Sequence, residues 1–157
     1  MKLAFHIAYF VVIGALLGAT FTLGAFVAPV IFKATLFFDN LPIDVYQSGR
    51  LMSEIFRRFN YLLIFALIVV AAYEIWRFVV KDRSKIAMVS AIAVLVFGSL
   101  FAAYYVPEIL YLQSLGVSHL QTAEFDAIHT QSEYVFKLLL FANLALLITH
   151  LLRFRAR

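Results

Sequence analysis

The uncharged run Leu3–Phe32 constrains this chain more than any other feature. It is longer than the roughly 20 residues that an α-helix needs to cross a hydrocarbon core of about 30 Å, so it predicts a membrane-spanning helix. The composition agrees, because 64% of the 157 residues are hydrophobic, 14% are charged and the mean hydropathy is +0.95. A soluble core of this size could not bury so much apolar surface. We therefore expect an integral membrane protein with a single domain over residues 1–157.

Further apolar segments complete a set of spans along the chain. The predicted spans are Leu3 to about Val30, Tyr61–Val80, Ile86–Val106 and Tyr134–Leu152. The second helix is expected to begin at Asp44, which is an acceptable N-cap. The fourth helix is expected to begin at Ser118, where Ser118-His119-Leu120-Gln121 has the form of a capping box, or at Thr122, which is a second possible cap. The predicted fold class is an all-α membrane protein. It is a four-transmembrane-helix bundle with an extended second helix and an extended fourth helix on the outer side.

Prolines and a turn are expected to delimit these helices. Pro29 has no N–H and clashes with the carbonyl four residues earlier, so a kink or stop is expected between Gly24 and Pro29. Pro107 is likewise expected to bend or end the third span. Residues 37–42 predict a turn, because they combine aspartate, asparagine and proline. No repeat of broken helices, the pattern of many transporters, is evident in the sequence.

Basic side chains are distributed unevenly over the predicted loops. The amino end, the second loop and the carboxyl tail contain Lys2, Arg77, Lys81, Arg83, Lys85, Arg153, Arg155 and Arg157. The third loop, residues 107–133, contains no lysine or arginine. The positive-inside rule then places both termini in the cytoplasm, and we expect the bacterial cytoplasmic (inner) membrane as the location. The first connection argues against this orientation, because it contains Lys33, Arg50, Arg57 and Arg58.

Several function classes are excluded or disfavoured. The chain has no cysteine, which excludes disulfides, thiolate metal sites and cysteine nucleophiles. It contains no phosphate-binding glycine loop, no H-E-x-x-H and no G-x-S-x-G, so we do not expect an enzyme. The formal charge of +4 reports membrane orientation here, and nothing in the sequence favours a nucleic-acid partner.

Gly14 and Gly18 form a G-x-x-x-G pair in the first span, which permits another helix to approach closely. We expect this face to pack inside the bundle. The alternative partners, besides the lipid bilayer, are a second copy in a homo-oligomer or a larger membrane complex.

Polar residues of the fourth helix recur close to one helical stripe, which contains His129, Ser132, Asn143 and His150. One interpretation is interhelical hydrogen bonding inside the bundle. The other is a ligand-binding pocket near the outer membrane edge, where polar residues of different helices reach one depth. The predicted pocket comprises His129, Ser132, Arg50, Arg57, Tyr61 and Glu108.

Ionisable residues also lie near the other membrane edge. Glu74 and Arg77 share a helical face beside Trp76, and they predict either a pair that extends to the interface or a functional acid. His6 and His150 could meet at one depth, as the axial ligation of a b-type haem requires. Zinc or copper binding lacks a helical histidine pair, so no metal site is predicted, and the cofactor stays unknown.

Motifs in a characteristic order resemble those of the transmembrane-protein-205-like family. They are Gly24-x-Phe26-Val27-Ala28-Pro29-x-x-Phe32, Ser48-Gly49 followed by Ile55-Phe56-Arg57 and Tyr61, Pro107-Glu108-Ile109, and Phe125-x-x-Ile128-His129-x-x-Ser132. The motif residues that carry the resemblance best are Gly24, Pro29, Phe32, Gly49 and Phe56. The resemblance implies a small four-span membrane protein of largely unknown function.

Three functions follow as hypotheses. The first is a small multi-pass membrane protein whose outer-side polar pocket binds or helps to move a small solute or a metal-related species. The second is an accessory subunit that packs against a larger membrane complex. The third is a b-type haem-binding membrane protein.

Overall fold

The computed structural model describes residues 2–37, 43–82 and 84–155, and every element in these ranges is helical. The helices are α1 (Lys2–Thr22), η1 (Leu23–Val27), α2 (Ala28–Phe32), η2 (Ala34–Leu36), α3 (Val45–Val79), α4 (Lys85–Leu100), η3 (Phe101–Tyr105), α5 (Val106–Ser114), η4 (Val117–Gln121) and α6 (Ala123–Arg155). Apart from Phe37, the turn predicted over residues 37–42 lies outside the described residues.

Within the described residues, four helical stretches are long and apolar enough to cross a membrane. They are Leu3–Phe32, Val45–Val79, Lys85–Ser114 and Ala123–Phe154. The prediction of a multi-pass all-α protein is confirmed, and the second and fourth spans are the long single helices α3 and α6, of 35 and 33 residues.

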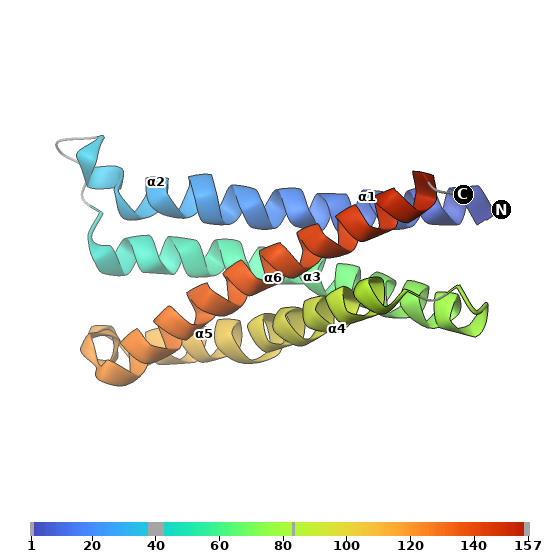
Figure 1. Ribbon diagram of the computed structural model, residues 1–157. Helices are drawn as coiled ribbons and strands as arrows, with labels where there is room; N and C mark the ends of the chain where they lie inside the picture. Colours follow the sequence, from blue (N-terminus) through green and yellow to red (C-terminus); the bar gives the residue numbers. More distant parts are fainter. Residues whose placement is uncertain (1, 38–42, 83, 156–157) are drawn as a thin grey trace.

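The spans form an up-and-down bundle (Figure 1). Helix α1 packs against α3 and α6, and α4 packs against the same two helices. Both chain ends lie at one end of the bundle together with the α3–α4 turn, and we call this the terminal end. The connections from α2 to α3 and from α5 to α6 lie at the opposite end, which we call the loop end.

Apolar side chains from all four spans fill the centre of the bundle. Ile13, Leu63, Val70, Val94 and Leu139 are fully inaccessible to solvent. Large side chains such as Val11, Ile68, Ile92 and Phe141 point outward instead. An outward apolar surface on every span is what a lipid environment requires, because hydrocarbon solvates these side chains.

The prolines do not end their helices. Pro29 and Pro107 each stand at the start of a short α-helix that directly follows a five-residue π-helical segment, η1 or η3. In these segments Ala28 N–H donates to the Leu23 carbonyl and Val106 N–H donates to the Phe101 carbonyl, five residues earlier. The wider turn makes room for the proline ring, so the helix continues past it.

The π segment of the third span leaves one carbonyl without its usual donors. The Ala102 carbonyl would accept from Val106 N–H in an α-helix, or from residue 107 in a π-helix, but Val106 donates elsewhere and residue 107 is proline. The side-chain amide of Asn60 on α3 donates to this carbonyl at 3.1 Å. Asn60 therefore supplies the hydrogen bond that Pro107 cannot make.

A repeat that the sequence did not make evident becomes visible in the fold. Spans one and three each contain a π segment followed by proline near the loop end, and each is followed by one long unbroken helix. The contacts of α1 with α3 and α6 match those of α4 with α6 and α3. The bundle therefore consists of two similar helical hairpins.

Gly98, and not the predicted glycine pair, is the close-contact position. A methyl group added at Gly98 would lie 2.6 Å from Leu67 Cδ2, whereas methyl groups at Gly14 and Gly18 would meet no atom within 4 Å. On α1 the core-facing residues are instead Ile13, Leu16 and others one turn apart. The expectation that the face with Gly14 and Gly18 packs inside the bundle is therefore wrong for the single chain.

Candidate functional site

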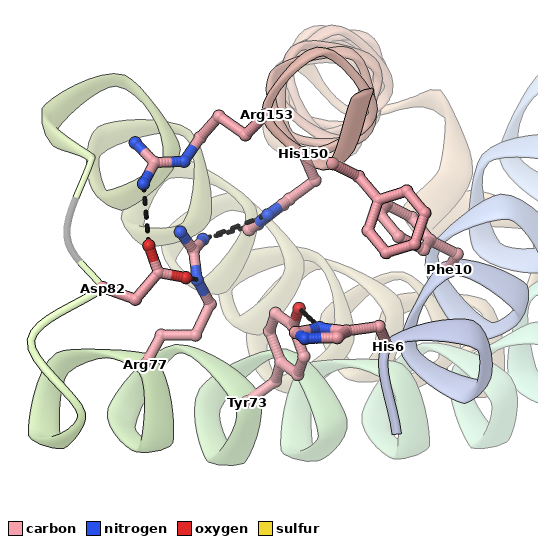
Figure 2. Close-up of a pocket in the computed structure, with 8 residues that line it drawn as sticks. His6, Phe10, Tyr73, Arg77, Asp82, His150 and Arg153 are labelled. Carbon is pink, nitrogen blue, oxygen red and sulfur yellow. Dashed lines mark hydrogen bonds and ion pairs between the residues drawn. The ribbon is translucent and has the colours of Figure 1, made fainter. Parts of the chain in front are cut away.

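Ionisable side chains gather inside the terminal end of the bundle. We call this group the terminal cluster, which comprises Tyr9, Glu74, Arg77, Asp82, His150 and Arg153. The residues come from α1, α3, the α3–α4 turn and α6, and Arg77, Asp82, His150 and Arg153 among them line one small cavity (Figure 2). Ionisable residues buried within membrane spans are costly, and they mark functional sites by default.

His150 is the centre of the terminal cluster and is buried, with 4% of its surface exposed. Its Nε2 lies 2.7 Å from Glu74 Oε1, and its Nδ1 lies 3.0 Å from Arg77 Nη1. Arg77 and Glu74 themselves approach to 3.7 Å. His150 thus joins α6 to two residues of α3, one turn apart.

Arg77 does not extend to the interface as one sequence interpretation expected, because only 3% of its surface is exposed. Its Nε donates to Asp82 Oδ2 at 3.2 Å, and Arg153 Nη2 donates to the other oxygen of Asp82 at 2.8 Å. Figure 2 shows this chain from Arg153 through Asp82 and Arg77 to His150. Burial of arginine is tolerable here because carboxylates pair with it and hydrogen bonds satisfy it.

Two stacked tyrosines close the α1 side of the terminal cluster. The rings of Tyr9 and Tyr73 lie 3.6 Å apart, centroid to centroid, at an interplanar angle of 8°. Tyr9 donates to Glu74 Oε1 at 3.3 Å, and its hydroxyl lies 3.4 Å from His150 Nε2. Tyr73 OH hydrogen-bonds His6 Nδ1 at 2.5 Å, which brings the second histidine to the same depth.

The cavity at the terminal cluster is too small for haem. It is lined by His6, Phe10, Tyr73, Arg77, Asp82, His150, Arg153 and Phe154, and its volume is about 20 Å³. This volume holds about one water molecule, whereas pockets for drug-sized ligands, which are smaller than a porphyrin, measure roughly 300–1,000 Å³. His6 and His150 do share one cavity, but both ring nitrogens of His150 already bond Arg77 and Glu74.

A second polar site lies at the loop end, and we call it the loop-end hollow. It is lined by Tyr46, Arg50, Glu54, Leu110, Gln113, Ser114 and Gly116, and its volume is about 340 Å³. Its walls are the first turns of α3, the last turn of α5 and Gly116. Gly49 faces α5 here, and a methyl group added to it would lie in ordinary contact with Gln113 Nε2, at 3.6 Å.

The basic residues of α3 differ in what they contact. Arg57 Nε and Nη2 donate to the two oxygens of Glu54 at 2.7 and 2.9 Å, and Arg58 Nε donates to the same carboxylate at 2.9 Å. Arg50 instead lies over the Tyr46 ring, at 5.9 Å from its centroid. Among the described residues, no carboxylate pairs with Arg50. The loop-end hollow therefore contains one guanidinium that is available to a ligand.

The six residues predicted to form one outer pocket are distributed over several places. Arg50 lines the loop-end hollow, Arg57 binds Glu54, and Tyr61 is 68% exposed on the outside of α3. Glu108 lies half-buried in the first turn of α5.

His129 and Ser132 face neither the hollow nor α3 in the described contacts. The ring of His129 stacks on Phe125 and meets the edge of Phe32, and its Nε2 lies 3.5 Å from Glu133 Oε1. Ser132 is buried and donates to the His129 carbonyl at 2.7 Å. In the described part of the chain, no three histidine, aspartate or glutamate side chains are arranged to hold a metal ion.

The rest of the polar stripe on α6 makes the interhelical hydrogen bonds of the first interpretation. Asn143 is fully buried and donates to the Ile13 carbonyl of α1 at 3.1 Å, and His150 contacts α3. The stripe therefore fastens α6 to its neighbours.

The motif residues occupy packing positions. Phe56 packs against Phe101 and Phe136 with ring centroids 5.3 and 5.4 Å away, and Phe136 lies over Gly24. Pro29 follows the π segment η1, and Phe32 contacts the edge of His129.

Sequence reasoning missed part of each site. In the terminal cluster it missed Tyr9, Asp82 and Arg153, and in the loop-end hollow it missed Tyr46, Glu54 and Gln113, among others. One usable signal was the i, i+4 spacing of Tyr46, Arg50 and Glu54, which places them on one face of α3. The missed cluster residues had no such signal, because Tyr9 lies on α1, Asp82 in the α3–α4 turn and Arg153 on α6.

Comparison with known proteins supplies a family of uncharacterised function. The family model described as "Domain of unknown function (DUF4149)" matches residues 11–118, more than half of the chain. This match overturns the resemblance to the transmembrane-protein-205-like family. No curated protein and no solved structure matches the chain.

Proposed function

We propose that this chain, which belongs to the DUF4149 family, is a small multi-pass membrane protein that binds a small anionic solute at the loop-end hollow. The ligand class is a carboxylate or a phosphate. The observation that carries the proposal is Arg50, whose guanidinium lines a hollow of about 340 Å³ without a carboxylate partner among the described residues. A guanidinium binds both anions through paired N–H donors.

The surroundings of Arg50 support an anion over a cation. Glu54 also lines the hollow, but Arg57 and Arg58 already bind both of its oxygens. Tyr46 and Gln113 add a hydroxyl and an amide, which can donate to an oxyanion. The volume falls at the lower end of the range for small-molecule sites, about 300–1,000 Å³. The proposal is a binding role without a catalytic step.

The orientation follows from charge and is part of the proposal. Lysine and arginine predominate at the terminal end, where Arg77, Lys81, Arg153 and others lie, and the acids Glu74 and Asp82 pair with arginine there. We place both termini in the cytoplasm of a bacterial cell with the protein in the inner membrane, so the hollow faces outward. A cysteine at Ser114 should react with a membrane-impermeant maleimide in intact cells. Reaction only after permeabilisation would reverse the orientation.

The binding test compares two arginines of the same helix. Purified protein in nanodiscs of neutral lipid is titrated with inorganic phosphate and with acetate, and binding is measured by calorimetry. Arg50→Gln should weaken binding about tenfold or more, because a hydrogen bond to a charged group is lost. Arg58→Gln should weaken binding less than Arg50→Gln does, since Arg58 is exposed and contacts Glu54 but does not line the hollow. Equal binding by Arg50→Gln, or none by the wild type, contradicts the proposal.

A second candidate function is that of an accessory subunit, and the exposed face of α1 favours it. In the most hydrophobic window of the first span 17% of the residues are buried, against 33%, 33% and 39% in the other spans. Gly14 and Gly18 lie on this helix, and a methyl group added at either position would meet no atom within 4 Å. Gly14→Leu should then release a co-purifying partner in mild detergent while the monomer stays folded. An unchanged assembly would count against this candidate.

A further inference from the structure

We propose that Glu74, His150 and Arg77 form a one-proton binding site at the terminal end, and that binding of the proton transfers the Arg77 guanidinium from His150 to Asp82. The proposal is independent of ligand binding at the loop-end hollow. Its basis is the arrangement of donors, acceptors and charges in the terminal cluster (Figure 2).

The hydrogen bonds assign the tautomer of His150. Arginine is only a donor, so the 3.0 Å contact from Arg77 Nη1 requires a lone pair on His150 Nδ1. The proton of the neutral ring then lies on Nε2, from which it is donated to Glu74 Oε1 at 2.7 Å. Arg77 Nη1 also lies 3.4 Å from Nε2, which is the longer of its two contacts with the ring. In this form both ring nitrogens are used.

The charges of the terminal cluster balance only while His150 is neutral. Two guanidinium groups, of Arg77 and Arg153, face the carboxylates of Glu74 and Asp82. A proton on His150 adds a third positive charge in a buried place. It also occupies Nδ1, so an N–H bond forms where the Arg77 N–H···N hydrogen bond was, and that hydrogen bond breaks.

Asp82 is a second hydrogen-bond partner of Arg77. Arg77 Nε already donates to Asp82, and the cavity of about 20 Å³ lies beside both residues. The imidazolium keeps its contact with Glu74, which gains strength because both partners are then charged. Arg77 therefore moves toward Asp82 and the cavity, while His150 stays with Glu74.

Access to the site is from the terminal end alone. The residues one helical turn deeper than Tyr9, Glu74 and His150 are Ile13, Val70 and Leu146, and all three are apolar and fully buried. This layer separates the terminal cluster from the loop end of the bundle. The proton therefore comes from, and returns to, the water at the terminal end, and the site does not conduct protons across the membrane in this conformation.

Several elements packed against His150 contribute titratable groups that compete for the proton. Helix α1 contributes Tyr9 and His6, α3 contributes Tyr73, Glu74 and Arg77, the α3–α4 turn contributes Asp82, and α6 itself contributes Arg153. Lys85 is the one titratable residue of α4, and it is exposed at the first position of that helix. Glu74 is the main rival acceptor for the proton, and the experiment separates it from His150.

The test is nitrogen-15 NMR of the full chain in nanodiscs, labelled at histidine and arginine and titrated through about pH 8 to 5, where histidines change charge. The His150 signals, identified by their loss in His150→Gln, should show a protonated Nε2 and a bare Nδ1 at high pH. As the pH falls, both nitrogens should become protonated, and the Arg77 guanidinium signals should shift at the same pH.

Variants provide the controls. In His150→Gln the amide can still accept from Arg77 and donate to Glu74, so the pH-dependent shift of Arg77 should vanish. In His6→Gln the shift should remain, because His6 contacts Tyr73. The proposal fails if His150 is the Nδ1–H tautomer at high pH or stays neutral while Glu74 takes the proton. It also fails if Arg77 does not respond to protonation of His150. These readings are made on the wild type, and the loss of the other histidine signals in His6→Gln, His119→Gln and His129→Gln assigns the His150 signals even where His150→Gln does not fold.

Discussion

The two ends of the bundle show how burial changes what a charged side chain requires. At the terminal end Arg77 is 3% exposed and is satisfied by Asp82, His150 and the nearby Glu74, so the charges are balanced and the space left over is about 20 Å³. At the loop end Arg50 is exposed, has no carboxylate partner among the described residues and lines a hollow of about 340 Å³.

The difference has a simple physical cause. An unpaired charge costs several kcal/mol in a water-free interior, but very little where water or a headgroup solvates it. The terminal cluster is therefore suited to hold helices and to exchange a proton, whereas the loop-end hollow is suited to receive a ligand. Four substitutions test this comparison.

The largest effect is expected from Arg77→Leu. Removing the guanidinium leaves Asp82 with one partner fewer and takes a donor away from buried His150, so the free energy of unfolding should fall by about 3–5 kcal/mol. Thermal unfolding in mild detergent, followed by circular dichroism, measures the change. Stability equal to the wild type would show that the terminal cluster is not the tight network described here.

A smaller loss of stability is expected from Gly98→Ala, which tests the close contact between α3 and α4. The added methyl group would lie 2.6 Å from Leu67 Cδ2, so α3 and α4 must separate or Leu67 must change rotamer, at a cost of about 1–3 kcal/mol. The matched control is Gly14→Ala, which has open space and should be neutral or slightly stabilising. The same unfolding assay compares the two, and the reverse order of stabilities would contradict the packing.

Asn60→Leu should cost about 1 kcal/mol, because the Ala102 carbonyl loses the donor that replaces the missing N–H of Pro107. The control is Tyr61→Leu, because the Tyr61 side chain is exposed on the outside of α3. Hydrogen–deuterium exchange around η3 should rise in Asn60→Leu and stay constant in the control. Unchanged exchange would mean that another group satisfies this carbonyl.

The smallest effect on stability is expected from Glu54→Gln. Glu54 is an exposed side chain on α3, and its arginine partners can be solvated by water in its absence, so unfolding should be unchanged. The substitution removes the negative charge of the loop-end hollow, so binding of phosphate should strengthen. Weaker binding would show that Glu54 positions the ligand and would revise the proposed anion specificity.

Much of the fold could be predicted because hydrophobic length is a local property. The four apolar segments, the length of α3 and α6, and the cap at Asp44 were all predicted from neighbouring residues. The cap is confirmed by the hydrogen bond from Gln47 N–H to Asp44 Oδ1 at 2.7 Å and by the return bond from Asp44 N–H to the Gln47 side chain. Thr122, the second cap candidate, accepts from Phe125 N–H at 3.2 Å.

The stop that was one expectation for Pro29 and Pro107 does not occur, because the π segments before them accommodate the ring and the helices continue. A local disturbance does lie where it was expected, since η1 overlaps the predicted interval between Gly24 and Pro29. Gly14 and Gly18 were expected against a neighbour, but α1 turns Ile13 and Leu16 inward instead, and Gly98 on α4 provides the close approach.

The sequence by itself determined that this chain folds as four apolar helices, with charges confined toward the ends, because the hydrocarbon core allows little else. It also indicated that Glu74, Arg77 and His150 lie near the same membrane edge. Only the tertiary structure decided that they touch, because the rotation of each helix about its axis depends on packing between elements. The same rotation put Arg50 in the loop-end hollow and His129 against Phe125, so a shared depth did not make a shared pocket.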